Sequence, residues 1–224
     1  MKTKSLSRGF TLIELLVVIS IIAMLAAGAY AGFGAIMPKI RANNTATKLG
    51  TIHKWLSAYA LDNGGAFPEG QTSNSALREM FKNDNYGADE MQFAIENDPY
   101  CKNFNGGKGP DGDKGRAPEY EQALQPGENP FAYVSGLSNS DDGRLPIMAN
   151  GFAGTDGRWT DNKTQKGGVF MGKYAAVVRV GGSAQATELK KEEDYEVREK
   201  SGGNMMNIFS SEFFGTSVSI LPPE

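Results

Sequence analysis

The distribution of charge divides the amino-terminal part of the chain into a basic stretch and a long apolar stretch. Residues 1–9 carry Lys2, Lys4 and Arg8, whereas residues 10–38 carry one charged side chain, Glu14. The 23 residues from Leu15 to Met37 are uncharged. As a helix rising 1.5 Å per residue they would extend about 35 Å, enough to cross a hydrocarbon core. The pattern therefore predicts a membrane-spanning helix in residues 10–38.

The basic stretch also predicts the orientation of the chain. Lysine and arginine beside a membrane helix tend to stay on the cytoplasmic side. The bulk of the chain, residues 39–224, then lies across the membrane. We therefore expect a single-pass inner-membrane protein with its globular part in the periplasm.

A second helical pattern follows Pro38. Apolar residues recur there at intervals of three or four, which is typical of an amphipathic helix: Ala42, Ala46, Leu49, Ile52, Leu56 and Tyr59. Asn63, Gly64 and Gly65, followed by Pro68, form a strong stop signal. We expect one long helix from about Thr11 to Asp62.

The remainder predicts a small, loop-rich α+β domain. We expect a short helix at 76–82, a short strand or turn at 91–96, a long loop at 103–127, and strands at 131–134 and 145–148. The clearest hairpin joins 173–180 to 183–189 through Gly181 and Gly182, a two-residue turn signal. The charged segment 188–200 is expected to be a solvated helix or loop. An apolar cluster between Met205 and Phe214 is expected to pack into the core or to contact a neighbouring subunit.

Composition narrows the class of protein. The chain has 224 residues, of which 40% are hydrophobic and 22% charged, with a formal net charge of -3. These values fit one globular domain and exclude a polytopic membrane protein and an acidic disordered chain. An acidic pI near 5.4 argues against nucleic acid as a partner. Cys101 is the only cysteine, so no internal disulfide can form.

The segment from Arg8 to Ile19, RGFTLIELLVVI, resembles the cleavage and methylation motif of type IV pilins and type II secretion pseudopilins. The resemblance implies that a prepilin peptidase cuts between Gly9 and Phe10 and that Phe10 becomes the N-methylated first residue. It implies that residues 1–9 are a leader, that 10–38 form a transmembrane and polymerisation helix, and that 39–224 form a pilin-like head with a long helix on a small antiparallel sheet. The 173–189 hairpin resembles that of major pseudopilin heads, with Gly181 in place of an aspartate.

The position of Glu14 has a chemical rationale. A new amino terminus at Phe10 is a cation in apolar surroundings, and a buried cation needs a partner. Glu14 lies one helical turn away and can pair with its own amine or with that of a staggered neighbour. The resemblance implies the second role, in which Glu14 sets subunit register as an isolated polar residue does in a coiled coil.

The implied function is a structural subunit of a pilus-like filament and not an enzyme. Its partners would be prepilin peptidase, like subunits, an inner-membrane assembly platform and, before assembly, membrane lipid. The absence of a cysteine pair favours a type II secretion pseudopilin over a type IV pilus pilin. Other hypotheses stay open: a membrane-anchored binding module that does not polymerise, and an exported enzyme released by signal-peptide cleavage after Ala29-Tyr30-Ala31.

Candidate catalytic and metal-binding residues are sparse. The only histidine, His53, lies on the predicted amphipathic helix, and a catalytic pair with Cys101 is disfavoured because no neighbouring residues resemble a site. Asp111 and Asp113 begin like a calcium loop, but Gly115, Arg116 and Gln122 break the pattern. Asp141 and Asp142 can contribute to an irregular oxygen site. We expect no cofactor, with calcium in the head as the alternative that the resemblance allows.

Overall fold

A computed structural model describes residues 10–101, 109–152, 154–215 and 217–223. The chain divides into two compact units, of which the first ends at Met37 and the second runs from Pro38 to Glu224. Helix α1 (Leu12–Asp62) begins in the first unit and ends in the second. Its bounds confirm the predicted long helix, which starts one residue later than expected. Among the described residues, no helix is both long enough and apolar enough to cross a membrane. The crossing expected for residues 10–38 therefore stays a prediction.

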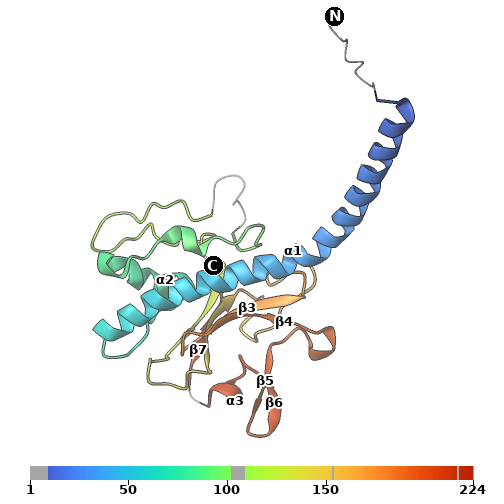
Figure 1. Cartoon of the computed structure of the whole chain (residues 1–224). Helices are drawn as coiled ribbons and strands as arrows, with labels where there is room; N and C mark the ends of the chain where they lie inside the picture. Colours follow the sequence, from blue (N-terminus) through green and yellow to red (C-terminus); the bar gives the residue numbers. More distant parts are fainter. Residues whose placement is uncertain (1–9, 102–108, 153, 216, 224) are drawn as a thin grey trace, which may run out of the picture. The chain divides into compact units, whose positions relative to one another are not determined.

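The second unit is built on a five-stranded antiparallel sheet in the order β4-β3-β2-β1-β7. Its strands β3, β4 and β7 are labelled in Figure 1. The strands are β1 (Phe131–Ser135), β2 (Pro146–Asn150), β3 (Tyr174–Arg179), β4 (Ala184–Glu188) and β7 (Ser219–Leu221). The predicted α+β class is confirmed, as are the strands near 131 and 145 and the hairpin around Gly181 and Gly182. In that turn the Gly182 amide donates to the Arg179 carbonyl at 2.8 Å, and Gly182 has a φ of 83°, which favours glycine.

Helix α1 packs its apolar face on this sheet. Five residues of this face are completely buried: Ala42, Leu49, Ile52, Leu56 and Ala60. A Cβ atom added to Gly50 would lie 3.4 Å from the Cβ of Ala184 in β4, so the helix backbone is close to this strand. The buried residues of this face repeat at the helical period, so one stripe of α1 faces the core while the opposite positions face water.

The described residues between α1 and β1 contain short helices and an isolated bridge from Ala66 to Ser138. Helix α2 (Ser73–Arg78) starts three residues before the predicted position, because Thr72 and Ser75 form a reciprocal capping box ahead of it. Three 3-10 helices follow: η1 (Glu79–Lys82), η2 (Asp84–Tyr86) and η3 (Glu90–Phe93). The element expected at 91–96 is thus a helical turn and not a strand. Residues 109–127 form turns and bends without helix or strand, as predicted, and 103–108 lie outside the described residues.

The carboxyl-terminal third differs most from expectation. The charged segment 188–200 contains a 3-10 helix, η4 (Lys191–Glu193), and enters a strand, β5 (Arg198–Ser201), that pairs with β6 (Asn204–Asn207). A solvated helix or loop was therefore the wrong prediction for residues 198–200. Helix α3 (Ser211–Phe214) leads to β7. Of the Met205–Phe214 cluster, Ile208, Phe209 and Phe214 are buried, whereas Met205 is 57% exposed.

The contrast between two leucines of α1 tests this packing. Leu56 is completely buried and Leu61 is 77% exposed. We expect Leu56→Ala to lower the free energy of unfolding by about 2–5 kcal/mol, because it removes buried methyl groups and leaves a cavity. Leu61→Ala, on the same helix, should change it by less than about 0.5 kcal/mol. Denaturant unfolding of the full chain in detergent, followed by tryptophan fluorescence, measures both; equal effects would contradict the assigned helix face.

Candidate functional site

The amino-terminal junction centres on the first turn of α1. Thr11 precedes the helix and Glu14 is its third residue. The Thr11 amide donates to Oε2 of Glu14 at 2.8 Å, and the Glu14 amide donates to Oγ1 of Thr11 at 3.3 Å. This reciprocal arrangement is a capping box, which satisfies amide groups that have no partner within the helix. The box sets the start of α1 immediately after Phe10 and Thr11.

The two oxygens of the Glu14 carboxylate have different surroundings. Oε2 also accepts from the Thr11 hydroxyl at 2.7 Å, so it receives two donors from the same residue. Oε1 receives no hydrogen bond from any described residue. Glu14 is thus held in one orientation by Thr11 while one oxygen stays available to a further donor.

The predicted processing residues, Gly9 and Phe10, precede this turn in the sequence. Phe10 precedes the helix and is 82% exposed. Gly9 lies outside the described residues, so the geometry of the expected scissile bond is not described. The sequence interpretation placed Thr11 near the start of the helix but missed its capping role. Its signal was readable in the sequence, since Thr-x-x-Glu before an apolar run is a helix-start signature.

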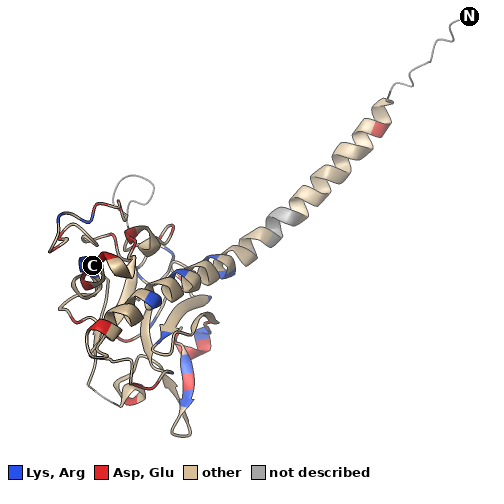
Figure 2. Ribbon diagram, turned by 60° about the vertical axis from the view of Figure 1, so that its left-hand side comes forward, with Lys and Arg blue, Asp and Glu red and all other residues tan. Residues whose placement is uncertain are grey.

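The helix that follows presents apolar side chains on every side. The charge view shows one acidic band close to its start and none in the tan stretch that follows before the head (Figure 2). Successive residues are exposed in the isolated chain, among them Leu15 (58%), Val17 (49%) and Ile19 (56%). A contiguous exposed apolar surface is typical of a site that contacts lipid or other protein.

Comparison with known proteins supports the same junction. Residues 4–30 match the family model for the prokaryotic N-terminal methylation motif, the type IV pilin and pseudopilin signature. The matched segment contains Gly9, Phe10, Thr11 and Glu14. No curated protein and no solved structure is detectably similar to the chain. The chain carries this signature on an α+β architecture, a helix on an antiparallel sheet, that is consistent with a pilin-like fold.

The other residues considered for catalysis have structural surroundings. His53 is buried on α1, with Nε2 2.9 Å from the Val180 carbonyl oxygen and Nδ1 3.4 Å from the Ser57 hydroxyl. Burial lowers the pKa of His53, which favours the neutral ring. Cys101 is buried, and burial raises the pKa of its thiol well above the usual range. Neither residue has the surroundings of an activated nucleophile.

The acidic loop residues considered for calcium are used within their own loops. Asp111 accepts the Asp113 amide at 2.7 Å, and Asp113 accepts the Gly115 amide at 2.9 Å. Asp141 accepts the Ser138 amide at 2.7 Å, while Asp142 pairs with Arg144 at 2.6 Å. Within the described ranges, no group of three or more His, Cys, Asp or Glu side chains is arranged to hold a metal ion.

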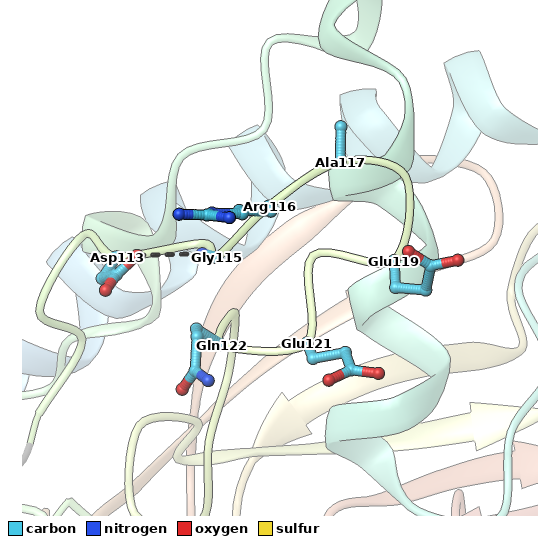
Figure 3. A pocket seen from close by; sticks show the side chains of 7 residues that line it. All are labelled: Asp113, Gly115, Arg116, Ala117, Glu119, Glu121 and Gln122. Carbon is cyan, nitrogen blue, oxygen red and sulfur yellow. Dashed lines mark hydrogen bonds between the residues drawn. The ribbon is translucent and has the colours of Figure 1, made fainter.

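An open hollow of about 540 Å³ lies beside these residues and is lined by seven residues between Asp113 and Gln122. Figure 3 shows the carboxylates of Glu119 and Glu121 on one side of it and Asp113 and Arg116 on the other. These four residues are exposed. An open polar hollow without a buried functional group does not identify a ligand.

The capping box gives a local prediction. Replacing Thr11 by valine removes the hydroxyl that accepts the Glu14 amide, and losing an N-cap costs about 1 kcal/mol. We expect hydrogen exchange of the Glu14 amide to accelerate about fivefold in Thr11→Val. Thr11→Ser keeps the hydroxyl and should behave like the wild type. The measurement is the hydrogen-exchange rate of the Glu14 amide, read by NMR in detergent micelles. Equal rates in the valine and serine variants would contradict the capping box.

Proposed function

We propose that the chain is the precursor of a structural subunit of a pilus-like filament, most specifically a type II secretion pseudopilin. In this proposal prepilin peptidase cuts after Gly9 and Phe10 is N-methylated. The observation that carries it is the methylation motif at residues 4–30. The matched residues run into helix α1, whose apolar side chains near its start are exposed in the isolated chain. A surface of this kind fits a subunit that passes from one apolar environment to another.

The membrane is the first of these environments in the proposal. The run of 23 uncharged residues after the basic leader supports an inner-membrane, single-pass location with the head in the periplasm. Transfer from lipid into a bundle of like helices keeps the apolar surface buried, so assembly does not expose it to water. An inner-membrane platform would guide that transfer. The role is structural, without enzymatic turnover or a cofactor.

Glu14 provides a specific contact for assembly. Thr11 holds Oε2, and Oε1 faces no described donor. After cleavage, the methylated amine of a neighbouring subunit can donate to Oε1 in a low-dielectric surrounding, where a charged pair is strong. One such pair per subunit fixes the axial stagger between helices, because apolar side chains alone permit several registers. The pseudopilin assignment is favoured over a surface pilin by the absence of a second cysteine that would close a disulfide loop.

The register contact predicts a separation between processing and assembly. Leaving one member of a buried ion pair without its partner costs about 3–5 kcal/mol. We expect Glu14→Ala to be inserted and cleaved, but to lower filament yield by about 100-fold or more. Ser20→Ala is the matched control, because Ser20 is polar, lies on the same helix, and bonds only to the Leu16 carbonyl of its own helix at 2.7 Å.

The measurement is a sheared-filament assay, with the amino terminus of each variant determined by mass spectrometry. Cleaved Glu14→Ala that forms filaments at the wild-type level would refute the register role. An equal loss in Ser20→Ala would show that any polar change in this helix blocks assembly.

A further inference from the structure

One buried carboxyl group fastens a long loop to the head. Glu90, the first residue of η3, is completely buried. Its Oε1 accepts the Leu124 amide at 2.6 Å, and its Oε2 accepts the Gly112 amide at 2.8 Å. Gly112 and Leu124 lie near opposite ends of the stretch 109–128. This stretch has no helix or strand of its own, so a single side chain secures it at two points.

A second carboxyl group faces the first. Glu128 is only 6% exposed, and the two carboxyl groups accept from consecutive amides, Glu90 from Leu124 and Glu128 from Gln125, which brings them close together. Oε2 of Glu128 is the atom that accepts the Gln125 amide. Asp111 adds a nearby negative charge to both. Two carboxyl groups in a buried site that face each other cannot both be ionised without a large energetic cost.

Among the described residues, no cation forms an ion pair with Glu90 or Glu128. Lys114 donates to the Ala88 carbonyl at 2.9 Å and lies over the Phe81 ring. Arg78 of α2 donates to the carbonyls of Ala123 and Leu124. The buried Cys101 thiol is neutral and supplies no charge. Within the described residues the pair therefore has no cation, and a shared proton is the remaining way to remove one of its two charges.

We propose that Glu90 and Glu128 share one proton and form a clasp that holds residues 109–128 on the head, so that loss of this proton loosens the loop. The protonated carboxyl donates to the carboxylate opposite. The three oxygens other than the donating one keep the amides of Gly112, Leu124 and Gln125. Deprotonation replaces this hydrogen bond with repulsion between two buried charges, which is relieved when the loop moves into water.

The direction of the pH effect follows from the two carboxyl groups. Burial, together with the charges of Glu90 and Asp111, raises the pKa of Glu128 to about 7, against the opposing hydrogen bond from the Gln125 amide. Burial also raises the pKa of Glu90. An unfolded glutamate titrates near 4.5. The folded head therefore binds more protons than the opened one between these values. The stabilisation is complete below about 4.5 and is lost as pH rises through about 7.

Hydrogen exchange of the full-length chain in detergent micelles, read by mass spectrometry at pH 5.5–8.5 in EDTA, tests the clasp. After correction for intrinsic exchange rates, we expect opening of the 109–128 peptides to rise with pH, approaching about tenfold per unit above pH 7. Glu128→Gln retains an amide that donates to Glu90 and an oxygen that accepts from Gln125, so its protection should not change with pH. Glu121→Gln, an exposed change in the same loop, should follow the wild type.

Several outcomes would overturn the clasp. One is wild-type protection that does not change with pH in EDTA. This result can be obtained even if no variant folds. Another is a Glu128→Gln protein with the wild-type pH dependence. A third is protection that follows added calcium at constant pH and not pH itself, because the pair would then be a cation site. The measurement uses unassembled protein, so its result is independent of the filament proposal.

Discussion

The burial of one stripe of α1 is the interaction on which the head depends. Leu49, Ile52 and Leu56 are completely buried, and the apolar stripe to which they belong lies on a sheet whose strands β1 and β2 are buried along their whole length. Residues outside the helices and strands complete the same core: Phe152, Trp159 and Phe209 are buried in it and their rings contact one another. The loops are thus part of the packed structure of the head.

The sequence predicted the elements in which hydrophobic residues recur at a regular interval or in which a specific turn signal is present. The α1 stripe repeats at the helical period, and Gly181-Gly182 marks the central hairpin, so both were found. The β5–β6 ribbon was missed because its residues are mostly polar and partly exposed, which removes the alternation that identifies a strand. Its turn at Gly202 and Gly203, both with positive φ, was the available signal. The edge strand β7 has three residues, too few for any periodicity.

The amino-terminal junction and the Glu90–Glu128 pair also differ in how far the sequence could predict them. The amino-terminal junction is contiguous in sequence, so roles for Gly9, Phe10 and Glu14 could be predicted from the motif, and the Thr11–Glu14 box follows a spacing of three residues. Glu90 and Glu128 lie 38 positions apart, and their encounter depends on how the loop folds over η3. No local rule relates such residues. A buried carboxyl pair without an ion partner becomes visible only when the packing is known.

The central claim is that the chain is processed as a pilin-type precursor, and the amino terminus of the protein recovered from its native membrane tests it most directly. Intact-mass and terminal-peptide mass spectrometry should find a chain that begins at N-methylated Phe10. The methyl group distinguishes this product from incidental proteolysis beside Gly9. A chain that begins at Gly32 would indicate a cleaved signal peptide and a released domain, and a chain that retains Met1 would indicate a static anchor. Either result would contradict the account.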